Sequence, residues 1–254
     1  MAPTRPPVTR LTYGALLALT AVAWVVTVRS PMAGDDIAGM GMVMTPSARG
    51  AVAYVGAWTV MMAAMMLPSA LPMIGLYAAT QRGAAPRPRQ AVAVGAFALM
   101  YLALWAATGV PLYFASLGLM AVSPGALAYV SAGALIAAGV FQLSPLKQVC
   151  LRHCRSPIGF LLGHWRGGWQ GGLALGWAHA GYCLGCCWAL MVVLAVAGAM
   201  GLAWVLAIAC LVAAEKLLPS GARVARAAGV GLVLLGVAVA VHPALASVLR
   251  ASRM

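Results

Sequence analysis

Residues 91–115 read AVAVGAFALMYLALWAATGVPLYFA, a run of 25 positions without a charged side chain. About 20 mainly apolar residues are enough for one helix to cross the hydrocarbon core of a bilayer. Similar apolar runs occur at residues 11–28, 51–79, 126–143, 171–200, 202–218 and 227–248. The sequence therefore predicts an all-α fold, a polytopic bundle of about seven transmembrane helices that forms a single domain over residues 1–254.

The composition excludes other classes of protein. Of the 254 residues, 64% are apolar and 7% are charged, whereas a soluble domain carries roughly 25% charged residues. A disordered chain is excluded as well, because such chains are poor in apolar residues. The net charge of +13 is typical of membrane-protein loops that face anionic lipid, so we predict a lipid bilayer and no nucleic acid as partner.

Basic residues are distributed unevenly between the two predicted faces of the bundle. Cytoplasmic loops of membrane proteins carry an excess of Lys and Arg. With the N-terminus in the cytoplasm, only Arg29, Arg49, Arg250 and Arg253 lie outside. The other 12 of the 16 basic residues lie inside: Arg5, Arg10, Arg82, Arg87, Arg89, Lys147, Arg152, Arg155, Arg166, Lys216, Arg223 and Arg226. This orientation places a Met-rich loop at residues 29–50 outside and a loop with Cys and His at residues 146–170 inside.

The fifth apolar run contains the run HAGYCLGCCWALM at residues 179–191. Positions three or four residues apart share one face of a helix, so His179, Cys183, Cys186 and Cys187 form one stripe near the middle of the span. Thiolates and imidazoles are ligands for soft and borderline metal ions. A lone buried Cys usually behaves as a small hydrophobe, but three Cys with a His on one face favour a metal site.

The second apolar run contains two Met pairs, Met61 with Met62 and Met65 with Met66. Two prolines follow in the same span, and a proline there can leave a backbone carbonyl without its helical partner. Thioether sulfur is a soft ligand, although Met is also a common filler of apolar cores. We predict these four residues as metal ligands at a depth similar to that of the Cys stripe.

The outer loop contains the run DDIAGMGMVM at residues 35–44, in which three Met alternate with smaller or apolar residues beside two Asp. Mobile thioethers suit Cu(I), because they are soft and do not titrate. A flexible loop without a ligand role explains the same run.

The inner loop contains Cys150, His153 and Cys154. At this spacing the three side chains converge on a short helix and form a metal site that lacks a fourth ligand. Neighbouring basic residues would favour the thiolate form of the two Cys, or they would simply contact lipid headgroups.

Glu215 is the single carboxylate within a predicted span. Ionisable groups are costly in the membrane and are usually functional there. The sequence leaves a ligand role and a structural anchoring role equally open.

Four separate runs resemble a family of bacterial integral membrane proteins that is catalogued as predicted metal-binding. They are WTVMMAAMMLPS at 58–69, KQVCLRHCRSPIGF at 147–160, GYCLGCCWALM at 181–191 and AAEKLLP at 213–219. Their shared order is more specific than any one run. The resemblance implies a bacterial cytoplasmic (inner) membrane location and metal binding by Met61, Met62, Met65, Met66, Cys150, Cys154, Cys183, Cys186, Cys187 and Glu215.

These features together predict a membrane protein that handles a soft metal, foremost Cu(I), by transport or by delivery to a partner. The partner would be a metallochaperone or a membrane metalloenzyme, and zinc is an alternative cargo. The other class of function is a membrane thiol-disulfide oxidoreductase that uses Cys183 and Cys186, which form a C-x-x-C pair. The chain contains no GxxxxGK[ST] loop and no evident hydrolase constellation, so we predict neither an ATP-driven pump nor a hydrolase.

Overall fold

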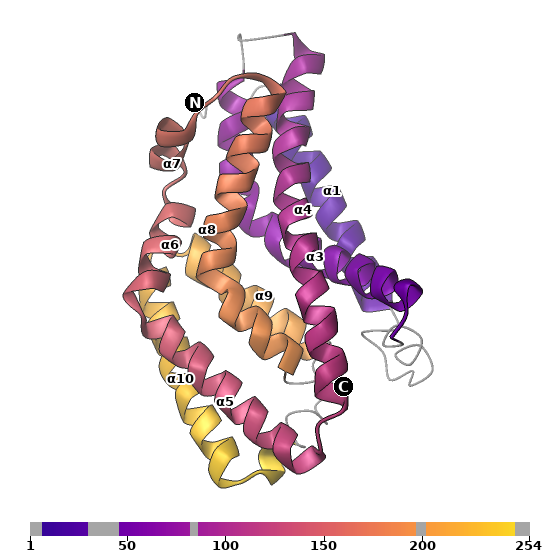
Figure 1. Cartoon of the computed structure of the whole chain (residues 1–254). Coiled ribbons are helices and arrows are strands. Elements are labelled where there is room, and N and C mark those ends of the chain that lie inside the picture. Colours follow the sequence, from indigo (N-terminus) through magenta and orange to yellow (C-terminus); the bar gives the residue numbers. More distant parts are fainter. Residues whose placement is uncertain (1–6, 30–45, 82–85, 197–201, 247–254) are drawn as a thin grey trace.

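The computed structural model describes residues 7–29, 46–81, 86–196 and 202–246, and within these ranges it contains helices and no strand (Figure 1). The predicted all-α fold is therefore confirmed. In chain order, the helices are α1 (Pro7–Arg29), α3 (Ala48–Thr80), α4 (Arg87–Met120), α5 (Pro124–Leu143), α6 (Pro145–Arg155), α7 (Pro157–His164), α8 (Gly168–Val196), α9 (Leu202–Leu217) and α10 (Gly221–Val241).

Six of the described helices are long and apolar enough to cross a membrane, namely α1, α3, α4, α5, α8 and α10. The remaining predicted span corresponds to α9, which has 16 residues, fewer than the roughly 20 that cross the hydrocarbon core. α9 nevertheless lies within the bundle, where Val205, Ile208 and Val212 are buried. A multi-pass bundle of about seven spans fits this arrangement.

The helices differ in length, and this difference determines which part of α8 lies beside the junction of the shorter helices. α4 has 34 residues and extends about 51 Å at 1.5 Å per residue, well beyond a core of about 30 Å. α5 and α10 have 20 and 21 residues and lie side by side (Figure 1), and α5 packs against α8. α6 and α7 continue from the end of α5 along the other end of α8. The α5–α6 junction consequently lies beside the middle of α8.

The predicted inner loop is a pair of short helices. Ser144 ends α5 and caps α6, because its hydroxyl accepts a hydrogen bond from the Lys147 backbone N–H at 3.2 Å. Pro145 and Pro157 occupy the first positions of α6 and α7, where the missing N–H costs nothing and the fixed φ suits a helix. The serine cap and the two prolines divide the predicted inner loop into two helices and turn α6 back against the bundle.

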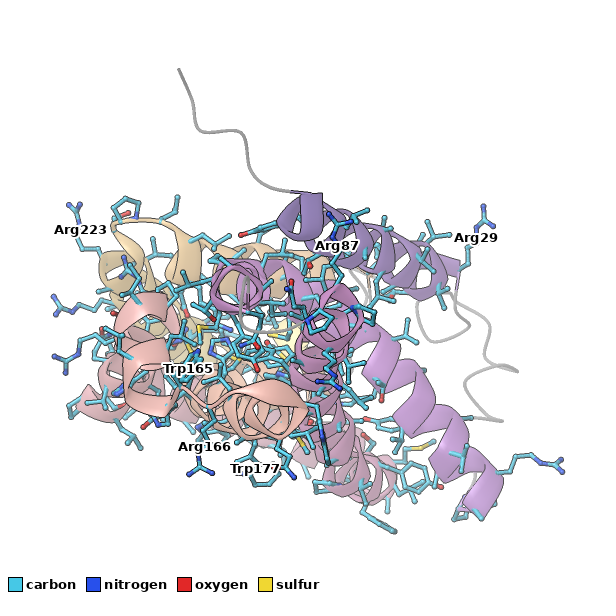
Figure 2. The ribbon with its side chains drawn as sticks, turned by 90° about the horizontal axis from the view of Figure 1, so that it is seen from above. Arg29, Arg87, Trp165, Arg166, Trp177 and Arg223 are labelled. Atoms are coloured by element: carbon cyan, nitrogen blue, oxygen red, sulfur yellow. The ribbon has the colours of Figure 1, made fainter. Side chains whose placement is uncertain are left out.

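Aromatic side chains fix α3 in the centre of the bundle. Trp58 donates its indole N–H to the Trp105 carbonyl and to the Thr108 hydroxyl, both at 3.1 Å. Near the other end of the helix, the Tyr77 hydroxyl donates to the Gly168 carbonyl at 3.2 Å. Polar tips need such partners in an apolar interior. By contrast, Arg166, Trp177 and Arg223 are exposed and extend from the outer edge of the bundle (Figure 2).

α4 and α8 approach each other through small residues. A Cβ atom at Gly172 would collide with the Ala93 carbonyl oxygen, and one at Gly176 would collide with the Phe97 carbonyl oxygen. Glycines one turn apart allow backbones to pack closely in membranes. The close approach holds Phe97 and its neighbours on α4 against the segment of α8 that leads to the thiols.

We predict that Gly176→Ala destabilises the protein by about 1–3 kcal/mol, as overpacking of a filled interior generally does. The matched control is Gly181→Ala on the same helix, because a Cβ atom there meets nothing within 4 Å. The free energy of unfolding in mixed detergent micelles measures both effects. Equal stability of the two variants would contradict the packing described for α4 and α8.

Candidate metal centre

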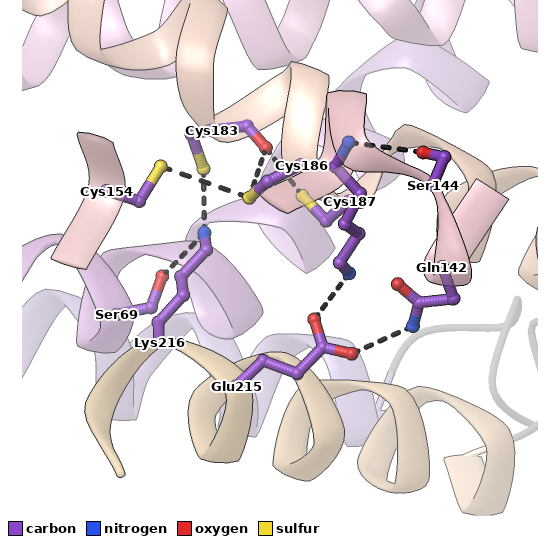
Figure 3. Close-up of polar contacts among 10 residues, drawn as sticks. Ser69, Gln142, Ser144, Cys154, Cys183, Cys186, Cys187, Glu215 and Lys216 are labelled. Carbon is purple, nitrogen blue, oxygen red and sulfur yellow. Dashed lines mark hydrogen bonds and ion pairs between the residues drawn. The ribbon is translucent and has the colours of Figure 1, made fainter. Parts of the chain in front are cut away.

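The Cys stripe of α8 faces the interior of the bundle. Cys183, Cys186 and Cys187 are at most 1% exposed, and His179 is 4% exposed. The thiols of Cys186 and Cys187 donate to the backbone carbonyl of Cys183 at 3.1 and 2.9 Å. These contacts follow from the helical spacing and draw the two sulfur atoms toward one point (Figure 3).

α6 brings further sulfur to the same place. The Cys154 sulfur lies 3.9 Å from the Cys186 sulfur, and the Cys150 sulfur packs against Gly185, where an added Cβ atom would lie 2.9 Å away. The sequence predicts two separate sites at different depths, whereas the structure brings the sulfur atoms of α6 next to those of α8. We refer to Cys150, Cys154, Cys183, Cys186 and Cys187 as the thiol cluster.

The pKa values of the two α6 thiols are raised above the usual value of cysteine. Burial raises the pKa of the Cys150 thiol, and the nearby Cys186 adds to the increase. The hydrogen bond with Cys186, followed by burial, raises the pKa of the Cys154 thiol well above its usual value. These directions run opposite to the expected effect of basic neighbours on the α6 thiols. Because metals bind the thiolate, loading of these two groups releases protons.

Lys216 is the cation at the thiol cluster, and sequence reasoning did not place it there. Its ammonium donates to the Cys183 sulfur at 2.9 Å and to the Ser69 hydroxyl at 3.3 Å. The Tyr101 hydroxyl lies 3.0 Å from the same Cys183 sulfur. The feature of the sequence that could have indicated this role is the position of Lys216 next to Glu215 within an apolar run.

The Met-bearing segment of α3 lies next to the thiol cluster. Met61, Met62, Met65 and Met66 are all buried, with at most 4% of each exposed. The Tyr101 hydroxyl that contacts Cys183 also donates to the Met66 carbonyl at 3.4 Å. One side chain of α4 thus bridges the Met segment and the Cys stripe, so the Met pairs are not turned toward lipid.

The two histidines of the predicted ligand set differ in their surroundings. His153 stacks on Tyr182 with ring centroids 4.3 Å apart, and its Nδ1 contacts the Val149 carbonyl at 2.9 Å. Neither of these two contacts of His153 involves a cysteine side chain. His179 stacks on Tyr101 at 5.7 Å, and its buried Nδ1 has no hydrogen-bond partner in the part of the chain that the structure describes.

Glu215 joins three helices beside the thiol cluster. One carboxylate oxygen accepts from the Lys147 ammonium at 2.6 Å, and the other accepts from the Gln142 amide at 2.8 Å. Glu215 and Lys147 are at most 1% exposed. The Arg155 guanidinium at the other end of α6 donates to the carbonyls of Leu218 and Pro219 at 2.7 and 2.8 Å. These contacts favour the anchoring role of Glu215, because they hold α6 at both ends.

Two further results limit the predicted site. Within residues 7–29, 46–81, 86–196 and 202–246, no group of three or more His, Cys, Asp and Glu side chains is arranged to hold one metal ion. The acidic and Met-rich run of the outer loop, residues 35–44, lies outside the described residues.

Comparison with known proteins identifies a family. Residues 55–239 match the model of a family described as PpoB2, copper chaperone. No curated protein matches the chain. No solved structure matches it either. The matched region covers most of the chain and includes every helix that contributes to the thiol cluster. The protein therefore belongs to the PpoB2 copper chaperone family, which confirms the metal-binding membrane family expected from the sequence and gives the chain a copper-related function.

Proposed function

We propose that this protein binds Cu(I) at the thiol cluster and delivers it to a partner at the membrane. The observation that carries the proposal is the 3.9 Å between the Cys154 and Cys186 sulfur atoms. Two sulfur atoms that share a metal lie no farther apart than two metal–sulfur bonds, about 4.6 Å for zinc. The pair therefore accepts an ion between α6 and α8 with little movement of either helix.

The donor atoms around this pair favour Cu(I). Cys183 and Cys187 lie within one helical turn of Cys186, and the Tyr101 hydroxyl contacts both Cys183 and the backbone carbonyl of Met66, one of the buried Met residues of α3. Thiolate and thioether sulfur select Cu(I), whereas hard ions prefer oxygen ligands. His179 adds an imidazole nitrogen without a protein partner. Zinc uses thiolates as well and is the alternative cargo.

Delivery requires that one ligand be replaced by a ligand of the partner. Cys154 suits this role because it lies at the C-terminal end of the short helix α6, whereas Cys186 lies within the long apolar helix α8. Cys154 also lies on α6, an 11-residue helix outside the membrane-spanning helices. We infer that copper leaves through Cys154 toward a metallochaperone or a membrane metalloenzyme. In a bacterial inner membrane with the N-terminus inside, this exchange takes place on the cytoplasmic side.

The same thiols support a second candidate, a membrane thiol-disulfide oxidoreductase. Its basis is the approach of Cys154 to Cys186, because disulfide exchange needs a partner thiol within reach. The Cys183–Cys186 pair suits it less, since the Cys186 thiol is directed to the Cys183 carbonyl. A reversible disulfide in a redox titration of the copper-free protein would favour this candidate.

Metal content of the purified protein tests the proposal. The full chain in detergent, kept under a reductant, is equilibrated with Cu(I) buffered by a competing chelator, and copper per chain is measured. We expect one Cu(I) bound per chain, with release when a partner thiol ligand is supplied. Absence of bound copper at every buffered concentration would contradict copper delivery by these thiols.

A further inference from the structure

Lys216 is a buried cation without a carboxylate partner in the described part of the chain. It is 8% exposed, and its ammonium donates to the Cys183 sulfur and the Ser69 hydroxyl. The adjacent Glu215 does not neutralise it, because both Glu215 oxygens accept hydrogen bonds from Lys147 and Gln142. The ion pair described among these residues is Lys147 with Glu215. The Lys216 ammonium thus lies against the thiol cluster without a carboxylate in contact with it among the described residues.

A buried charge normally has a compensating partner, because transfer of an unpaired ion from water is costly. The groups that face the Lys216 ammonium are the Cys183 sulfur at 2.9 Å, the Ser69 hydroxyl at 3.3 Å and, farther away, Cys186, Cys187, Cys154, Tyr101 and His179. The Cys183 sulfur, which accepts from this ammonium, is therefore the nearest group that can carry a compensating negative charge. Any metal ion bound by the same sulfur atoms lies close to a fixed positive charge.

We propose that Lys216 is a specificity-determining residue that makes the thiol cluster favour a monovalent soft ion, such as Cu(I) or Ag(I), over a divalent ion such as Zn(II). This inference rests on the proposed copper-binding function. Coulomb repulsion from the ammonium is twice as large for a dication as for a monocation at the same distance. The repulsion is weakly screened, since the site is buried away from water and salt. The thiols alone supply no such distinction, because thiolates bind zinc as well.

Substitution of Lys216 tests this inference through the ratio of two dissociation constants, for Zn(II) and for Cu(I), measured on the same full-length protein in detergent. Lys216→Gln removes the charge and retains a hydrogen-bond donor for Ser69 and Cys183. We expect it to lower the ratio of the Zn(II) to the Cu(I) dissociation constant by about tenfold or more. Lys216→Arg keeps the charge and should leave the ratio within about threefold of the wild-type value. Lys216→Leu provides a second neutral variant if Lys216→Gln does not fold.

The outcomes separate this inference from the proposed function. If the wild-type protein binds Cu(I) and the neutral variants keep the wild-type ratio, the role of Lys216 is overturned while copper binding stands. A shift in Lys216→Arg as large as that in Lys216→Gln also overturns it, since charge would then not be the cause. If the wild-type protein binds no Cu(I), the proposed function itself fails.

Discussion

Replacement of Cys186 by Ser should weaken Cu(I) binding by more than about 100-fold, because loss of a second-shell partner alone costs 10–100-fold in metal affinity. Cys186 is the α8 thiol that lies 3.9 Å from Cys154, so its removal eliminates the pair that joins α6 to α8. Serine supplies a harder oxygen of similar size, which Cu(I) does not prefer. Chelator competition under a reductant measures the change in the dissociation constant.

The matched control for this prediction is Cys210→Ser. Cys210 is a free, exposed cysteine on α9 and is not part of the thiol cluster, so its replacement should leave the affinity unchanged. Cys154→Ser should weaken Cu(I) binding as much as Cys186→Ser does, because each substitution removes one member of the same pair. If copper binding were lost in Cys210→Ser, or retained in both of the other variants, the assignment of the site would be wrong.

Replacement of Lys147 by Leu should destabilise the fold by about 3–5 kcal/mol, the usual effect of removing one partner of a buried ion pair. The Lys147 ammonium and the Glu215 carboxylate are 2.6 Å apart, with 0% and 1% of the side chains exposed. After the substitution, the Glu215 carboxylate keeps only the Gln142 amide as a partner and must remain buried as a charge or take up a proton. Unfolding in mixed detergent micelles measures the loss.

A double variant and a surface variant distinguish the ion pair from a general effect of charge. Lys147→Leu combined with Glu215→Leu should recover most of the lost stability, because apolar replacement of an entire buried pair is often neutral or stabilising. Arg223→Leu should change the stability by less than about 0.5 kcal/mol, since Arg223 is exposed and points away from the bundle (Figure 2). A double variant as unstable as Lys147→Leu would show that the pair does not anchor α6.

The helical bundle and the Cys stripe could be predicted from the sequence because both follow from local patterns. Apolar runs of sufficient length determine the spans, and a spacing of three or four residues determines which side chains share a helix face. Cys183, Cys186 and Cys187 are therefore found on one buried face, as predicted.

The assembly of the site could not be predicted, because it depends on contacts between distant segments. The sequence predicts that Lys147 lies in an exposed loop. In the structure its side chain is fully buried against Glu215, which is 68 residues away in the sequence. Lys216 contacts Cys183 across 33 residues. No local pattern indicates that α6 turns back toward α8, so the sequence predicts Cys154 and Cys186 at different depths of the membrane.

The position of copper in crystals of the Cu(I)-loaded protein tests the central claim most directly, through anomalous scattering at the copper absorption edge. The account predicts one strong peak between the sulfur atoms of Cys154 and Cys186, inside the bundle and beside Lys216. A peak at a surface histidine or in the outer Met-rich loop, with none at the thiol cluster, would contradict it.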